Sequence, residues 1–237
     1  MKKKIILSLL LIVALVTVAG CGKKEEKKDN KEALAFKEEY EALNGKMARF
    51  KKEHRTLSIP EDNPYVKVTP AKVLEMIENK ESFFLYVGDP LCPWCRSVIE
   101  QSIETAKSYG IDKIYYIDFW DDENKEILRD VYELVDGKIT KTVEETEEYK
   151  KLLDLCGDDL GLRNYTVKDK NGKEVEVNSK RFFGPTFLYV QNGVFKKYTD
   201  ARSSKQAGQL DELTEEIKKD MDENFGNFFV EVCDDAC

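Results

Sequence analysis

Four residues in the middle of the chain have the types and spacing of a redox site. Cys92-Pro93-Trp94-Cys95 stands between an apolar run and a segment with helical spacing of apolar residues. A cysteine at the start of a helix meets unpaired backbone N–H groups and the positive end of the helix dipole, and both favour its thiolate. Pro93 suits the first helical position because the N–H that it lacks would have no partner there. Arg96 adds positive charge nearby, so we expect Cys92 to be the attacking thiolate.

Cys95 lies three residues further along, on the same face of the predicted helix. It can attack a mixed disulfide on Cys92 and release the partner, which completes thiol–disulfide exchange. An inert structural disulfide and a structural zinc site are the alternatives. Zinc needs about four ligands, and the only histidine, His54, belongs to the N-terminal segment. We expect no metal and no cofactor.

A strand before the two cysteines and a helix after them must position the pair. Residues 83–87 are an apolar run that ends at Gly88-Asp89-Pro90, and a helix is predicted from Pro93 to about Tyr109. A second strand is predicted over 113–119, and Thr69-Pro70 opens a helix further upstream. This strand–helix–strand order indicates an α/β domain that starts near residue 65.

The downstream half predicts two helical segments, two hairpins and a closing helix. Asp136-Gly137 separates the two helical segments, whereas Asn171-Gly172 and Asn192-Gly193 sit between alternating runs, which is typical of tight hairpins. In chain order these elements are expected at about 122–135, 144–156, 165–177, 186–198 and 205–224, and a cysteine-containing tail follows over 226–237.

Two motifs in this order are similar to those of the thioredoxin family. The strand at 83–87 with the Cys-Pro-Trp-Cys run resembles the family's first core strand and active site, and 183–193 resembles its cis-proline strand and hairpin. The resemblance covers about 65–225 and implies a central mixed sheet flanked by helices, with a helical and hairpin insertion over about 120–180. It also implies a cis Gly184-Pro185 peptide that faces Cys92 and, with Trp94, binds an extended segment of the substrate.

The chain departs from that family at two positions beside the cysteines. Tyr86 stands where thioredoxins have a buried acid, and Leu91 replaces a tryptophan. The Pro-Trp pair is closer to the Pro-aromatic pair of glutaredoxins. The overall layout resembles thioredoxin-like lipoproteins and bacteriocin-accessory proteins of Gram-positive bacteria, a likeness that assigns no substrate.

The N-terminus resembles a bacterial lipoprotein signal. Three lysines at 2–4 precede a short apolar run over 5–18, and Val18-Ala19-Gly20-Cys21 resembles a lipobox. The resemblance implies a signal peptide over 1–20 and a lipid on Cys21 that anchors the protein to the extracytoplasmic face of the cell membrane. An uncleaved membrane anchor is the alternative, and it too would place the rest of the chain outside the cytoplasm.

Two segments separate the anchor from the predicted domain. Residues 21–33 are mostly charged and predict a disordered tether. Residues 34–64 predict a helix and a loop, and Gly45 weakens that helix in its middle. The apolar residues of the helix recur at helical spacing, at Phe36, Tyr40, Leu43, Met47 and Phe50.

The charge balance excludes some partners. The formal charge is −8, and removal of residues 1–20 takes away three lysines and no acid, which leaves −11. A surface this acidic repels nucleic acid and anionic lipid. We therefore expect no nucleic-acid partner, and we assign membrane attachment to the lipid anchor alone.

Three cysteines remain once Cys21 and the active pair are assigned. Outside the cytosol disulfides persist, and Cys233 and Cys237 are close enough in sequence to form one. That tail disulfide is the leading interpretation. Alternatively, one of the two pairs with Cys156, or relays electrons to Cys92 and Cys95.

The function that these features predict is thiol–disulfide exchange with client proteins that carry thiols or disulfides, supported by a separate redox partner. Whether the pair oxidises, reduces or isomerises depends on its potential, which spacing does not indicate. Two other functions stay open: a metallochaperone that binds a metal through thiolates, and a non-catalytic module that binds extended peptides.

Overall fold

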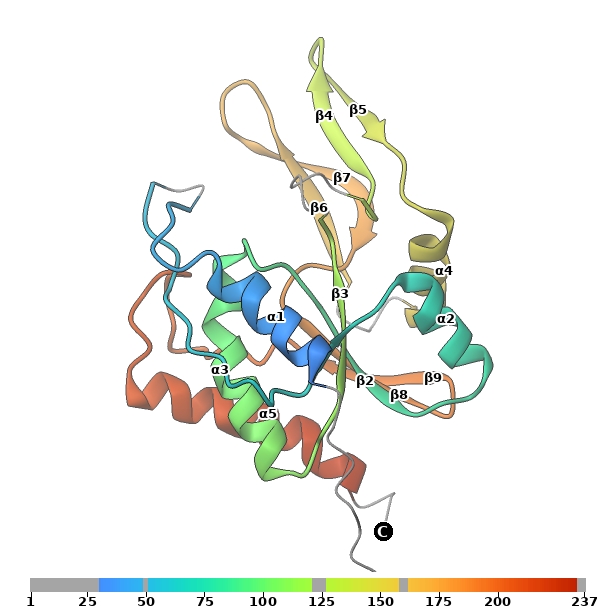
Figure 1. The fold of residues 1–237 in the computed structure, drawn as a ribbon. Helices are drawn as coiled ribbons and strands as arrows, with labels where there is room; N and C mark the ends of the chain where they lie inside the picture. Colours follow the sequence, from blue (N-terminus) through green and yellow to red (C-terminus); the bar gives the residue numbers. More distant parts are fainter. Residues whose placement is uncertain (1–29, 49–50, 121–126, 158–161, 234–237) are drawn as a thin grey trace, which may run out of the picture.

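The computed structural model describes residues 30–48, 51–120, 127–157 and 162–233 (Figure 1). A five-stranded sheet lies at its centre in the order β1-β3-β2-β8-β9. The first three strands of that order are parallel and the last two run antiparallel to their neighbours, which confirms the predicted mixed sheet. The strands are β1 (Tyr65–Lys67), β3 (Ile114–Asp118), β2 (Phe83–Gly88), β8 (Thr186–Gln191) and β9 (Val194–Thr199).

Helices cover both faces of this sheet. One face carries α1 (Lys31–Glu41), α3 (Pro93–Ser108) and α5 (Glu215–Cys233), and the other carries α2 (Pro70–Glu78) and α4 (Glu147–Cys156). Figure 1 shows the first group on the left and below the sheet and the second group on the right. The described chain is therefore a three-layer α/β structure with one hydrophobic core on each side of the sheet.

The central strand β2 explains this layering, because all six of its residues are buried. Phe84 and Tyr86 enter the core beneath α3 and α5, and the alternate residues Phe83, Leu85 and Val87 enter the core beneath α2 and α4. Successive side chains of a strand point to opposite faces, so a continuous apolar run fits a strand covered on both sides.

The predicted start of α2 and the predicted turn between β8 and β9 are confirmed. Thr69 caps α2 by accepting a hydrogen bond from the backbone N–H of Lys72, and Pro70 is the first helical residue. Asn192 and Gly193 both have positive φ, as a tight hairpin turn between β8 and β9 requires.

The insertion between β3 and β8 differs in part from the prediction. It contains two hairpins, β4 (Val131–Val135) with β5 (Lys138–Val143), and β6 (Arg163–Lys168) with β7 (Glu174–Arg181), which extend from one end of the central sheet (Figure 1). The predicted helix over 122–135 is wrong for 127–135, where the chain forms a bend and then β4, and residues 122–126 lie outside the described residues. Asp136 and Gly137, with φ of 49° and 76°, form the turn of a hairpin rather than a break between helices.

The N-terminal helix ends earlier than predicted, and it starts at Lys31, within the segment 21–33 that was expected to be a disordered tether. α1 ends at Glu41, a turn follows, and Gly45 has a φ of 71° that a helix does not allow. Met47 lies beyond the helix and is 61% exposed, and Phe50 lies outside the described residues. Phe36 and Tyr40 are buried in the core with Tyr65 and Tyr116, so α1 is part of the folded body.

The closing helix starts later and ends later than predicted. The chain before it turns at Gly208, whose N–H donates to Asp211, and Thr214 then accepts a hydrogen bond from Ile217 at the start of α5. The helix continues to Cys233 and buries Phe228 and Phe229 in the core, so residues 226–233 are not a separate tail. Within the part of the chain that the structure describes, no helix is both long and apolar enough to cross a membrane.

Candidate active site

Cys92 and Cys95 lie at the start of α3, directly after the short loop that connects β2 to this helix. Cys92 is the residue before the first helical turn, with extended φ and ψ of −77° and 118°, and Pro93 is the first helical residue, as predicted. Cys92 is partly exposed, whereas Cys95 is completely buried, and both are free thiols. One sulfur can therefore be reached from solvent and the other is enclosed beside it.

The two thiols have opposite pKa shifts. Hydrogen bonding with Cys95, and then with the backbone N–H groups of Cys95 and Trp94 at the helix start, lowers the pKa of Cys92, although burial and the charge of Asp89 oppose the shift. Burial raises the pKa of Cys95, and the paired Cys92 raises it further. Cys92 is therefore the thiol that ionises first, and a thiolate is the nucleophilic form of cysteine.

A cis peptide bond between Gly184 and Pro185 faces this pair. The Sγ atom of Cys92 donates to the carbonyl oxygen of Gly184 at 3.5 Å. A Cβ atom on Gly184 would lie 2.5 Å from the Sγ atom of Cys95, so only glycine fits here without displacement of its neighbours. The structure thus brings together the cysteines and the Gly184-Pro185 peptide, as the resemblance implied.

Trp94 lies half-buried at the rim of the site. The guanidinium of Arg202 stands over its indole ring, 4.8 Å from the centroid, and Asp200 accepts hydrogen bonds from that guanidinium. The guanidinium thereby covers one face of the indole ring and holds Trp94 in place, two positions after Cys92 in the chain.

A cleft of about 400 Å³ opens in front of Cys92. Its lining includes Pro93 and Gly184, and the insertion supplies Tyr165 and Arg181. Sequence reasoning did not find Tyr165 and Arg181, because they lie at least 70 positions after Cys95 and no spacing pattern connects them with the cysteines.

Two arginines hold the insertion side of the cleft in place. The Arg181 guanidinium lies over the Tyr165 ring at 3.5 Å from the centroid and pairs with Asp130 at 3.2 Å. The Arg129 guanidinium lies over the Phe119 ring at 3.7 Å from the centroid. Both arginines are buried, so they fix the hairpins against the central sheet rather than add mobile surface charge.

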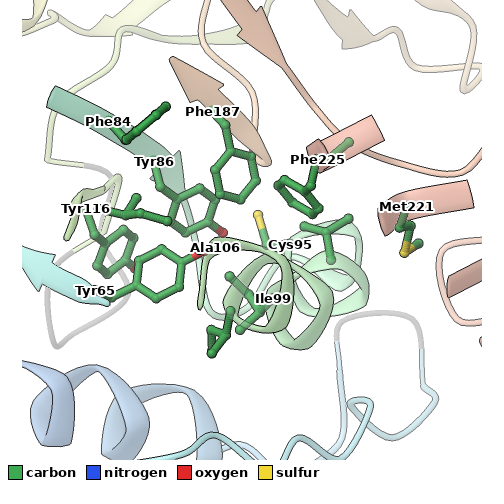
Figure 2. Packing of buried hydrophobic residues seen from close by; sticks show 14 of the residues in the cluster. Tyr65, Phe84, Tyr86, Cys95, Ile99, Ala106, Tyr116, Phe187, Met221 and Phe225 are labelled. Carbon is green, nitrogen blue, oxygen red and sulfur yellow. The ribbon is translucent and has the colours of Figure 1, made fainter. Parts of the chain in front are cut away.

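Behind the cysteines, Tyr86 occupies the core position at which thioredoxins carry a buried acid. Figure 2 shows its side chain directed toward Cys95. Its hydroxyl is placed to hydrogen-bond with the Cys95 sulfur, and it is 2.9 Å from the hydroxyl of Tyr40, which comes from α1. Three buried polar groups therefore line up from the N-terminal helix to the second cysteine.

Arg96 does not add charge at the site, contrary to the expectation from its position. Its guanidinium is completely buried and points to the N-terminal segment, where it donates to the backbone oxygens of Tyr40 at 2.8 Å and Arg55 at 2.6 Å. It also donates to the side-chain oxygen of Asn44 at 2.8 Å. Arg96 thus fastens residues 31–64 to the active-site helix.

The remaining cysteines lie away from the pair or outside the described residues. Cys156 is a buried free thiol in α4, on the other face of the sheet from Cys95, and burial raises its pKa. The backbone of Cys233 ends α5, and Cys21 and Cys237 fall outside the described residues. In the described ranges, no group of three or more His, Cys, Asp or Glu side chains is arranged to hold a metal ion.

Comparisons with known proteins add no assignment to this geometry. No family model matches the chain, and a search of curated proteins finds no significant match.

Proposed function

We propose that the protein is a thiol–disulfide oxidoreductase with a thioredoxin-like domain. The observation that carries the proposal is the asymmetric pair: a partly exposed Cys92 with a lowered pKa, next to a buried Cys95, both facing the cis Gly184-Pro185 peptide. The mixed sheet with helices on both faces, and the cysteines at the strand–helix junction, support the thioredoxin-like assignment.

The reaction follows from the order in which the two thiols ionise. The Cys92 thiolate attacks one sulfur of a client disulfide, which forms a mixed disulfide and releases the other client sulfur as a thiol after it takes a proton. Cys95 then attacks the Cys92 sulfur, the Cys92–Cys95 disulfide forms, and the second client sulfur leaves as a thiol. The client gains two electrons and two protons, and the reverse sequence oxidises a client dithiol.

The client is proposed to bind along the cis-proline loop. The backbone around Phe183 and Gly184 lies beside Cys92 at the edge of the cleft, where an extended client segment can form backbone hydrogen bonds. Trp94, which follows the cleft residue Pro93, is proposed to offer the client an apolar surface, and Tyr165 lines the cleft from the insertion. In this arrangement the client disulfide would contact the partly exposed sulfur of Cys92 and not the buried sulfur of Cys95.

Reduction of insulin with dithiothreitol as electron donor, combined with trapping, tests this function. We expect the wild type to accelerate reduction, Cys95→Ala to accumulate mixed disulfides on Cys92, and Cys92→Ala to lose activity and trap few partners. Cys156→Ala is the matched control, because its thiol is buried on the other face of the sheet, and it should behave as the wild type.

The outcome separates the competing functions. If the wild type binds unfolded insulin chains but neither exchanges nor traps disulfides, the protein is a peptide-binding module. If it instead takes up stoichiometric copper or zinc through Cys92 and Cys95 and catalyses no exchange, it is a metallochaperone.

The anchor and the tail cysteines are part of the same proposal. The Val-Ala-Gly-Cys run leads us to propose a lipid on Cys21 and a location on the extracytoplasmic face of the membrane. Cys21→Ala should leave unprocessed precursor without lipid labelling, and labelling that persists in this variant contradicts the proposal.

Mass mapping of the oxidised protein tests the proposed Cys233–Cys237 bond, and a link from either residue to Cys156 would refute it.

A further inference from the structure

In the second step of the proposed reaction, Cys95 must act as a thiolate, although its buried surroundings disfavour a charged sulfur. Cys95 must ionise to attack the mixed disulfide on Cys92, yet it is completely buried, and burial raises its pKa. Phe187 of β8 and Phe225 of α5 pack in the core around it and offer its sulfur no hydrogen-bond donor (Figure 2). Some group must favour the charged form of Cys95 for closure to be fast.

The charged and titratable groups near Cys95 leave one candidate donor, because the hydroxyl of Tyr65 pairs with Ser102 at 2.6 Å and that of Tyr40 pairs with Tyr86 at 2.9 Å. Asp89, from the loop after β2, is negative and raises the pKa of Cys95, and Cys92 is already bonded to the client at this stage. Arg96 is turned toward the N-terminal segment. The hydroxyl of Tyr86 on β2 remains, and it is placed to hydrogen-bond with the sulfur.

Tyr86 suits the role of a donor and not that of a base. Burial raises the pKa of Tyr86 well above its usual value, so its hydroxyl keeps its proton at neutral pH. Its ring lies across Gly88: a Cβ atom on that residue would come within 2.1 Å of the ring carbon that bears the hydroxyl. The absence of a side chain at Gly88 is therefore what lets the ring lie in this orientation.

Tyr40 supports the Tyr86 hydroxyl from the N-terminal helix. The two oxygens are 2.9 Å apart, and both tyrosines are completely buried. Arg96 in α3 donates to the backbone oxygen of Tyr40, so the residue next to Cys95 also fixes the position of Tyr40. Either hydroxyl can donate across this contact, so when Tyr86 donates to Cys95, the Tyr40 hydroxyl can donate to Tyr86. A hydroxyl that accepts one hydrogen bond becomes a stronger donor of the next.

We propose that Tyr86 is a catalytic residue that donates a hydrogen bond to the Cys95 thiolate during closure, and that Tyr40 is a positioning residue for Tyr86. The inference rests on the proposed function. In the step concerned, the bond between Cys92 and the client sulfur breaks, the Cys92–Cys95 bond forms, and the proton of Cys95 ends on the departing client sulfur.

An aromatic disulfide that releases a coloured thiolate, 5,5′-dithiobis(2-nitrobenzoate), separates this step from the first attack in stopped flow. Attack by Cys92 releases one coloured thiolate at a rate proportional to reagent concentration, and attack by Cys95 releases a second at a rate independent of it. Other cysteines also react with the reagent, so each closure rate is read as the difference between a protein and its Cys95→Ala counterpart.

We expect Tyr86→Phe to slow the second release about tenfold near neutral pH and to move its pH midpoint up by about one unit, because a hydrogen bond to a charged group is lost. The first release should stay within about twofold of the wild type. Tyr40→Phe should shift the midpoint in the same direction by less. Tyr116→Phe is the matched control, since its buried hydroxyl has no hydrogen-bond partner in the described structure, and it should change neither phase.

An unchanged closure rate and midpoint in Tyr86→Phe overturn the inference. So does a slower closure with an unchanged midpoint, which indicates a purely structural effect of the substitution. Absence of the second release in the wild type is a different result, because it contradicts the proposed function itself. Denaturation of each variant in urea verifies that the Phe substitutions leave the protein folded.

Discussion

The sulfur of Cys95 occupies the space that a side chain at Gly184 would need. A Cβ atom on Gly184 would lie 2.5 Å from that sulfur and 3.2 Å from the Cα atom of Gly88. At Gly184 the cis-proline loop therefore approaches both the end of β2 and the start of α3, with the Cys95 sulfur and the Gly88 backbone as its nearest neighbours. This close approach is what holds the Gly184 carbonyl within reach of Cys92.

Gly184→Ala should consequently impair the site. The added methyl group must push the loop away from Cys95, and we expect exchange to slow by at least about tenfold and stability to fall by about 1–3 kcal/mol. Insulin reduction and urea denaturation measure the two effects. Gly137→Ala is a control, because Gly137 has positive φ but a Cβ atom there would have no neighbouring atom within 4 Å. The substitution should lower stability through backbone strain alone and leave the exchange rate unchanged. Unchanged exchange in Gly184→Ala would refute the close-contact argument.

The cysteines should alkylate in a defined order. The pKa of Cys92 is lowered and its side chain is partly exposed, so iodoacetamide should label it first and at a lower pH than an unstructured cysteine. Burial raises the pKa of Cys95 and of Cys156, and both should be labelled only after unfolding. Mass mapping across a pH series gives the order, and prior labelling of Cys95 would reverse the assigned roles.

Arg96→Met should loosen the N-terminal segment. The substitution removes hydrogen bonds to the backbone oxygens of Tyr40 and Arg55 and leaves both acceptors without this donor, at a cost of about 3 kcal/mol. Urea denaturation measures the loss, and limited proteolysis should show faster cleavage within residues 31–64. Lys107→Ala, which breaks an exposed ion pair with Asp62, should cost less than about 1 kcal/mol. An equal cost for both variants would contradict the role assigned to Arg96.

Asp118 should make stability depend on pH. Burial, and then the charge of Glu39, raises the pKa of Asp118 to about 8 in the folded protein. Because this value is above that of the unfolded chain, the group stabilises the fold fully below about pH 4 and loses that contribution as the pH rises toward 8. Asp118→Asn should therefore be more stable than the wild type at pH 9, by roughly 1–3 kcal/mol, and close to it at pH 4.

Urea denaturation at several pH values tests this difference. Glu39→Gln is the matched variant: it removes the neighbouring charge, so the loss of stability should move to lower pH. A constant difference between wild type and Asp118→Asn at every pH would exclude the titration of Asp118 as its cause.

The parts of the fold that sequence predicts are those with local signals. The Thr69-Pro70 start of α2, the Asn192-Gly193 turn and the apolar strand β2 each carry their cause within a few residues. Residues 131–135 were misassigned to a helix because a strand of five residues gives too short an alternation, and Asp136-Gly137 is compatible with a break or a turn.

The candidate site likewise has features that local sequence signals predict and features that depend on distant residues. The Cys-Pro-Trp-Cys spacing and the start of α3 are local, so the position of Cys92 before the first helical turn was predictable. The contact between Tyr40 and Tyr86 joins residues 46 positions apart, and the donation from Arg96 to Tyr40 joins residues 56 positions apart. Such pairs depend on how α1 packs on the sheet, which no single-sequence pattern encodes.

Together with the proposed lipid on Cys21, the position of α1 would also limit where the protein can act. α1 starts at Lys31 and already packs in the core, so a lipid on Cys21 would be separated from this helix by only ten residues of chain, at most about 35 Å. A protein held this way samples a thin layer above the bilayer rather than the whole extracytoplasmic space. Its clients would then be chains that emerge from the membrane or stay attached to it, met at high local concentration within that layer.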